Sequence, residues 1–138
     1  MNFDVIDTMV RTAMDAIRNA YAEHGGIAAG ACVLSSDGTL YSGCSIDNAV
    51  PELALSAEVV AMTRAIADGK REFDAVAIIA DIEGSYIPDE ASCQFLAEFN
   101  VPEVVMADLD GNVNVVKLEE LIPYKLRRRP HSDENTYE

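Results

Sequence analysis

The segment FDAVAIIAD, residues 73–81, is an almost continuous apolar run. Runs of this kind are typical of strands in sheets that are buried on both faces. Such a sheet needs a layer of helices packed against each face. This one segment therefore favours an α/β protein.

Helical and extended patterns alternate in the first half of the chain. Residues 2–22 place apolar side chains on one helical stripe, and the glycines of the following EHGG predict the end of that helix. Residues 27–46 read as a β-hairpin around the turn SSDGT. We therefore expect a helix followed by two antiparallel strands.

The second half continues the alternation. Residues 56–70 predict a second helix, with Ser56 as its N-cap and Gly69 as its stop. Residues 90–99 predict a third helix, and residues 102–123 predict two strands around an Asp-Gly-Asn turn and a short closing helix. The order α-β-β-α-β-α-β-β-α predicts a mixed five-stranded sheet with helices on both faces, a three-layer α/β/α fold.

The charge of the chain limits its partners. Asp and Glu outnumber Lys and Arg by 24 to 10, so the net charge is −14. A surface of this sign repels phosphate backbones and acidic membranes, so we expect neither nucleic acid nor membrane as a partner. No apolar run reaches the ~18 residues of a membrane span. The start MNFDVIDTMV lacks the basic residues of a secretory signal, which predicts a cytoplasmic protein.

The cysteine and histidine content is low. The three cysteines form no CxxC pair, and an odd number argues against a disulfide framework. With only two histidines, the chain has few ligands for a standard zinc site. Residues 127–138 are polar, so we expect one domain over residues 1–126 and a tail after it.

Four segments carry a resemblance to a known family. They are GACVLSSDGTLYSGCSIDNA at 30–49, SAEVVAMTRAIADGKREFDAVAIIAD at 56–81, PDEASCQFLAEF at 88–99 and VVMADLDGNVNVVKLEELIP at 104–123. In order, they resemble the hairpin and nucleoside loop, the cysteine-Ala-Glu helix with its strand, the Pro-Cys-Gly-x-Cys-Arg-Gln segment and the closing strands of the small homotetrameric cytidine deaminases. The resemblance implies their three-layer fold, a nucleoside-like ligand and a homotetramer.

In that family, three cysteine thiolates hold a catalytic zinc ion. The matching positions here are Ser56, Asp89 and Ser92, while the family glutamate remains as Glu58. A serine hydroxyl stays protonated near neutral pH and is a poor zinc ligand, whereas Ser and Asp are favoured helix N-caps. The resemblance therefore implies degenerate metal positions and no zinc cofactor, and without zinc no water is activated for attack.

The resemblance also implies which residues would contact a nucleoside. Ser45 and Asp47 replace a family Asn and Glu that bind the ribose hydroxyls, and both retain hydrogen-bonding groups. Ile27 replaces an aromatic residue under the base and keeps an apolar wall. Ala57 precedes Glu58 in the family's Ala-Glu pair. We expect these four positions to surround the ligand.

A shifted metal site is an alternative. Asp89 and Cys93 lie four residues apart on one helical face, and Glu90, Glu58 or His24 could supply a further ligand. Cys93 is equally explained as a small buried side chain, His24 as an exposed loop residue and Glu58 as a first-turn carboxylate that favours the helix dipole.

Three functions follow from these residues. The first is a degenerate family member that binds a nucleoside without zinc-dependent deamination. The second is an enzyme of changed chemistry, a hydrolase of a nucleoside or related amidine-type substrate with Glu58 as acid and base. The third is a cytidine deaminase that holds zinc through atypical ligands.

Overall fold

The computed structural model describes residues 1–122, so the predicted tail at 127–138 and the last four residues of the predicted 1–126 domain lie outside it. This part of the chain contains one five-stranded sheet and three α-helices. The helices are α1 (Phe3–Ala16), α2 (Ala57–Ala67) and α3 (Glu90–Glu98). Short 3-10 helices add η1 (Ile17–Asn19), η2 (Pro51–Leu53) and η3 (Leu118–Leu121).

The strands are β1 (Ala29–Ser35), β2 (Leu40–Cys44), β3 (Phe73–Ala80), β4 (Glu103–Ala107) and β5 (Val113–Lys117). Their order across the sheet is β2-β1-β3-β4-β5. β3 and β4 are parallel, while the other three neighbouring pairs are antiparallel. The predicted mixed five-stranded sheet is confirmed.

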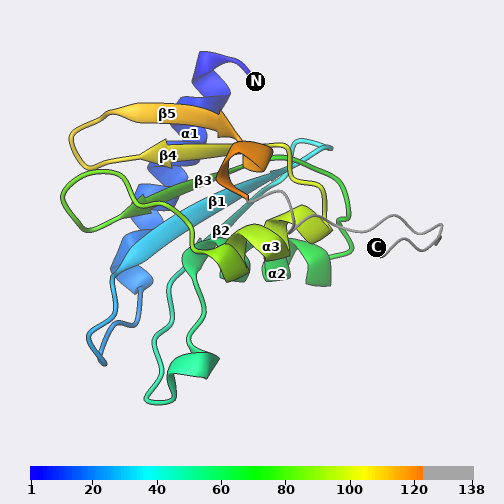
Figure 1. Cartoon of the computed structure of the whole chain (residues 1–138). Helices are drawn as coiled ribbons and strands as arrows, with labels where there is room; N and C mark the ends of the chain where they lie inside the picture. Colours follow the sequence, from blue (N-terminus) through cyan, green and yellow to red (C-terminus); the bar gives the residue numbers. More distant parts are fainter. Residues whose placement is uncertain (123–138) are drawn as a thin grey trace.

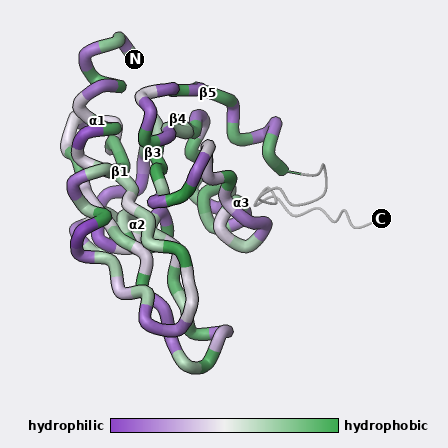
Figure 2. The backbone as a smooth tube through the Cα atoms, turned by 90° about the vertical axis from the view of Figure 1, so that its left-hand side faces the viewer, coloured by the Kyte–Doolittle hydropathy of each residue, from purple (hydrophilic) through white to green (hydrophobic). Residues whose placement is uncertain are grey.

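Helices cover both faces of the sheet. Figure 1 shows α1 behind the strands and the pair α2 and α3 on the other side, and Figure 2 shows the layers from the side. Alternate residues of β1 and β3 divide between two buried clusters: Cys32 and Ile79 pack with α1, whereas Val33 and Ile78 pack with α2 and α3. The apolar run of β3 is buried at every position except Asp74, as expected for a central strand.

Close packing of α2 on β2 depends on Gly43. A Cβ atom there would lie 2.4 Å from the backbone nitrogen of Ala61 and 2.6 Å from the carbonyl oxygen of Ala57. No real side chain tolerates such distances to backbone atoms, so glycine permits this approach. The approach fixes the first turn of α2 against the sheet.

The first helix ends earlier than the sequence predicts. The pattern over residues 2–22 predicts one helix that stops at EHGG, but α1 stops at Ala16 and η1 at Asn19. The backbone of Tyr21 is extended and bonded elsewhere: its N–H donates to Ser45 O at 3.0 Å, and its carbonyl accepts from Asp47 N at 2.8 Å. These tertiary hydrogen bonds take the place of a further helical turn.

The closing segment also differs in detail. The predicted short helix is a single 3-10 turn, η3. Gly69 ends α2 as predicted and has a φ of +95°, which is the left-handed conformation that glycine adopts without strain. Within residues 1–122, no helix has the length and apolar character needed to span a membrane.

Candidate functional site

Two helix N-termini meet at the centre of the candidate site. Ser56 caps α2, and its Oγ accepts a hydrogen bond from the backbone N–H of Val59 at 3.3 Å. Asp89 caps α3, and its Oδ1 accepts from the N–H of Ser92 at 2.8 Å. Ser92 Oγ then donates to Ser56 Oγ at 2.9 Å. The structure therefore brings together the three residues that the resemblance predicts at the zinc-ligand positions, and Ser56 and Asp89 are N-caps as expected.

Glu58 lies in the first turn of α2 and is completely buried. Neither of its carboxylate oxygens has a hydrogen-bond partner in the described part of the chain. Burial raises the pKa of Glu58 to about 7, and the nearby charge of Asp89 acts in the same direction. The backbone N–H of Glu58 and the hydroxyls of Ser92 and Ser56 oppose this shift, although neither hydroxyl completes a hydrogen bond to it. A carboxyl group in this state can release or accept a proton near neutral pH.

A cavity of about 420 Å³ opens beside the two helix N-termini. Five of the predicted site residues line it: Ile27, Ser45, Asp47, Ser56 and Asp89. The other lining residues are Tyr21, Gly25, Gly26, Ile46, Pro51, Ala54, Leu55 and Tyr86. We call this cavity the helix-tip pocket.

Ala57, Glu58 and Ser92 are not part of the pocket lining. Ala57 is buried, and its carbonyl faces Gly43 of β2. Ser56 and Asp89, which line the pocket, both influence the pKa of Glu58, so the buried carboxyl group lies near that wall without lining it. A direct contact between Ala57 and a ligand stays a prediction.

Ser45 is engaged by the protein backbone. Its Oγ accepts a hydrogen bond from the N–H of Ala29 at 2.9 Å and donates to the carbonyl of Ile27 at 3.0 Å. The hydroxyl thus ties the start of β1 to the end of β2. Its predicted contact with a ribose hydroxyl would use its remaining acceptor capacity.

Asp47 holds the loop of residues 24–26 in place at the pocket wall. Its carboxylate accepts from three backbone N–H groups: His24 at 2.7 Å, Gly26 at 3.2 Å and Asn48 at 2.8 Å. These bonds, led by that of Asn48, lower the pKa of Asp47 below its usual value. Asp47 is therefore ionised at neutral pH and shapes the wall as well as lining it.

The residues of the alternative metal site do not assemble. No group of three His, Cys, Asp or Glu side chains able to hold a metal ion exists within residues 1–122. Cys93 is buried, its Sγ donates to Pro88 O at 3.7 Å, and burial raises the pKa of its thiol to about 11. The prediction of a small buried side chain is confirmed for Cys93, and His24 is exposed as expected.

The side chains of Ser56, Asp89 and Ser92, at the predicted zinc-ligand positions, do not fit zinc either. Two are neutral hydroxyls that bond to each other, and the third is a carboxylate oxygen already used as a helix cap. Structural and catalytic zinc sites use thiolate, imidazole or carboxylate ligands, at least three from the protein. Among these three residues and Glu58, only Asp89 and Glu58 have a side chain of such a type, which is fewer than the three ligands required.

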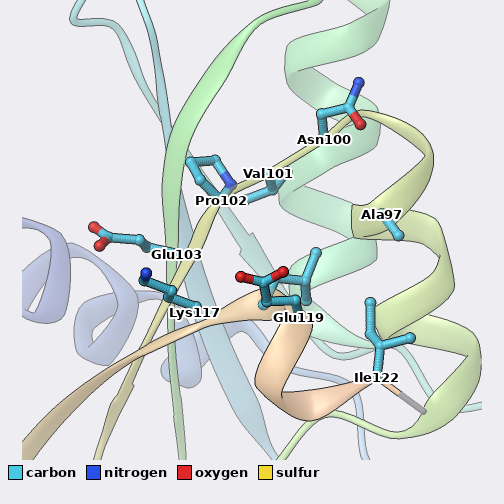
Figure 3. A pocket seen from close by; sticks show the side chains of 9 residues that line it. Ala97, Asn100, Val101, Pro102, Glu103, Lys117, Glu119 and Ile122 are labelled. Carbon is cyan, nitrogen blue, oxygen red and sulfur yellow. The ribbon is translucent and has the colours of Figure 1, made fainter. Parts of the chain in front are cut away.

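A second cavity, of about 510 Å³, lies elsewhere. It is lined by Ala97, Asn100, Val101, Pro102, Glu103, Lys117, Leu118, Glu119 and Ile122. Figure 3 shows it between the end of α3, the start of β4 and η3. None of the predicted site residues lines it, so the smaller helix-tip pocket is the candidate functional site.

Two tyrosines at the helix-tip pocket were not predicted from the sequence. Tyr86 lies in the loop before α3, packs against the core and lines the pocket. Tyr21 lines it too, and its ring is 6.3 Å from that of His24. The sequence signal for Tyr86 is its place three residues before the cap Asp89. Both supply the aromatic surface that Ile27 lacks.

Comparison with known proteins agrees with this architecture. The sequence model of the cytidine deaminase-like family matches residues 11–111. The cytidine deaminase of Sporosarcina psychrophila is 33% identical over 121 residues, which cover 86% of this chain and 88% of that protein.

Solved structures give the same answer. The crystal structure of cytidine deaminase from Burkholderia pseudomallei superposes with a TM-score of 0.82 at 31% identity, covering 89% of this chain and 98% of that one. Cytidine deaminase from Mycobacterium leprae has a TM-score of 0.72 at 28% identity, over 85% of this chain and 96% of that one. The chain belongs to the cytidine deaminase-like family.

Proposed function

We propose that this chain binds a nucleoside-like ligand in the helix-tip pocket and does not carry out zinc-dependent deamination. One observation supports this most: Ser56 and Asp89 cap two helices, and Ser92 bonds to both of them, at the three positions expected to replace the family's zinc ligands. With no thiolate among them, these positions offer hard, mostly neutral donors. Without bound zinc, water keeps a pKa of about 15.7 rather than about 7 and is a weak nucleophile.

The pocket itself supports ligand binding. It combines apolar and aromatic walls from Ile27, Tyr21 and Tyr86 with polar groups of Ser45 and Asp47. Pockets of roughly 300–1,000 Å³ with this mixture are typical of small-molecule sites. The relatives described above are cytidine deaminases, so a nucleoside is the ligand class that we propose.

Glu58 favours a second candidate function. A buried carboxyl group with a pKa of about 7 suits general acid–base catalysis near neutral pH. The chain would then be a hydrolase of a nucleoside or related amidine-type substrate, with Glu58 moving the proton. The family resemblance further supports a homotetramer and a cytoplasmic location. Light scattering of the purified protein would test the number of subunits.

Two measurements on one preparation test the proposal. Elemental analysis should find less than stoichiometric zinc, and incubation with cytidine should leave its absorbance unchanged. A thermal-shift screen of nucleosides should raise the unfolding midpoint, because a ligand that binds only the folded state stabilises it by RT ln(1 + [L]/Kd). Stoichiometric zinc together with cytidine turnover would instead establish the deaminase with atypical ligands. Hydrolysis of another nucleoside by metal-free protein would establish the second candidate.

A further inference from the structure

The helix-tip pocket carries charge of one sign. Asp47 and Asp89 are its two charged lining residues, and no Lys, Arg or His of the described chain lines it. Glu58 lies behind the wall formed by Ser56 and Asp89, fully buried and with both oxygens unpartnered. Two carboxyl groups therefore line a cavity that offers them no basic side chain, and a third is buried behind its wall.

Neighbouring side chains respond to this negative field. Burial raises the pKa of Tyr86 to about 12, and the charges of Glu58 and Asp89 add to the shift. Burial also raises the pKa of Cys93 to about 11, and Glu58, Asp89 and Glu90 add to that shift. No positive charge opposes either shift. Burial is the larger cause of both shifts, and the charges that add to them are all carboxylates.

The helix dipoles do not reverse this sign. The N-termini of α2 and α3 each correspond to roughly half a positive charge, or about one in total. The formal charges of Asp47 and Asp89 together exceed that total, and Asp89 also caps α3 directly. The ring of His24 is exposed, contacts Tyr21 and lies outside the lining. The balance of charge stays negative.

The pocket walls add two features that favour a cation. Tyr21 and Tyr86 present aromatic rings, which attract cations through their faces. Glu58 does not line the pocket, but its unpartnered carboxyl group adds negative charge behind the wall when it is ionised. The carboxylates of the wall would repel a phosphate group.

We propose that the helix-tip pocket selects a nucleoside-like ligand that bears a positive charge, through the lining carboxyl groups of Asp47 and Asp89 and the buried, unpartnered carboxyl group of Glu58 behind them. This inference rests on the proposed nucleoside-binding function and narrows it. A neutral nucleoside binds more weakly, and a nucleoside monophosphate is excluded.

A matched ligand series tests the inference. Cytidine, 5′-amino-5′-deoxycytidine and cytidine 5′-monophosphate differ at the 5′ substituent, in its charge and, for the monophosphate, also in its size. N3-methylcytidine carries the charge on the base instead. Dissociation constants are measured by isothermal titration calorimetry at 50 mM and 500 mM NaCl. We expect one of the two cations to bind about tenfold more tightly than cytidine at low salt, and the monophosphate at least tenfold more weakly. High salt should reduce both differences.

A charge-removing variant locates the effect. Asp89→Asn removes a charge but keeps an oxygen that can cap α3, since Asn is as good an N-cap as Asp. It should reduce the ratio of cation affinity to cytidine affinity several-fold. The matched control, Asp110→Asn, removes an exposed charge from the β4–β5 turn and should leave that ratio unchanged.

The outcomes separate the two claims. If cytidine binds and neither cation binds more tightly, or the monophosphate binds as tightly as cytidine, charge selection is wrong while nucleoside binding stands. If none of the four compounds binds, the proposed function fails and this inference fails with it. An unchanged ratio of cation affinity to cytidine affinity in Asp89→Asn would also overturn the role of Asp89 in charge selection. If that variant does not fold, the salt dependence of cation binding to the unmodified protein decides whether charge selection holds.

Discussion

Ser92 Oγ donates a hydrogen bond to Ser56 Oγ across 2.9 Å and thereby joins the first turns of α3 and α2. The two residues are 36 positions apart in the sequence. Each belongs to a cap: Ser56 accepts from Val59 N, and the N–H of Ser92 is bound by Asp89. One small polar network therefore caps the N-termini of two helices and connects them.

Removing one hydroxyl of this network should destabilise the protein. Ser56→Ala leaves the N–H of Val59 without its cap and the hydroxyl of Ser92 without its acceptor. Loss of an N-cap typically costs about 0.5–2 kcal/mol, and the stranded hydroxyl places the expected loss near the upper end. Urea denaturation of both proteins measures the difference in unfolding free energy.

A matched variant separates capping from the general effect of serine removal. Ser85 is exposed in the loop between β3 and α3. Ser85→Ala should change the unfolding free energy by no more than about 0.5 kcal/mol. Equal effects of the two substitutions would contradict the capping role of Ser56.

The buried carboxyl group of Glu58 should make stability depend on pH. Its pKa in the folded protein, about 7, lies above its ordinary value of 4.5. Between these pH values the unfolded chain releases a proton that the folded protein keeps, so the contribution of Glu58 to stability is full below pH 4.5 and is lost as pH rises to 7. Glu58→Gln has no such proton. Relative to the unmodified protein, the variant should gain up to about 3 kcal/mol between pH 4.5 and pH 8.

Comparison with an exposed glutamate controls for the high net charge. Glu52→Gln removes the same charge from an exposed position in η2, so its stability difference should stay nearly constant over this pH range. Denaturation curves at several pH values supply both differences. A flat difference for Glu58→Gln would show that Glu58 ionises normally in the folded protein.

The sequence was sufficient for the fold because its strongest signals are local. The apolar run at 73–81 predicts a central strand, SSDGT predicts a hairpin, and Ser56 predicts a helix start, all of which the structure contains. The end of α1 was missed because it depends on hydrogen bonds of Tyr21 to Ser45 and Asp47, which are distant in the sequence. A periodic pattern cannot report such bonds.

The site could be predicted only in part for the same reason. Residue types at 56, 89 and 92 indicate caps, but their mutual hydrogen bonding depends on how α2 and α3 pack. The loop of residues 81–89 has no periodic pattern, so only the place of Tyr86 three residues before the cap Asp89 connected it with the pocket. Likewise, the sequence identifies Asp47 as a polar residue without indicating that three backbone N–H groups bind it.

Restoring three thiolates should restore metal binding. The triple variant Ser56→Cys, Asp89→Cys and Ser92→Cys places sulfur where two oxygens are now 2.9 Å apart. Tetrahedral zinc with Zn–S bonds of about 2.3 Å needs sulfur atoms roughly 3.8 Å apart, which a small outward shift supplies. Helix N-termini also favour thiolates. Elemental analysis should find about one zinc per chain in the triple variant.

Variants with two of the three cysteines are the control for that experiment. They lack the third protein ligand of a stable site and should bind much less zinc under the same dialysis conditions. Failure of the triple variant to retain zinc would mean that these positions do not correspond to the family's ligands. In that case the proposed loss of the zinc site would lose its main support.

Tyr86 should provide the aromatic contact that Ile27 cannot. It lines the helix-tip pocket and packs against the core, so its ring is held in place beside any bound ligand. Stacking of a base on an aromatic ring is worth about 1–3 kcal/mol. Tyr86→Leu keeps an apolar side chain but removes the ring face, so nucleoside affinity should fall about tenfold or more, as measured by calorimetry. Tyr86→Phe keeps the ring and should bind within about threefold of the unmodified protein. Equal affinities of the Leu and Phe variants would mean that the ring fills space in the core without stacking on the ligand.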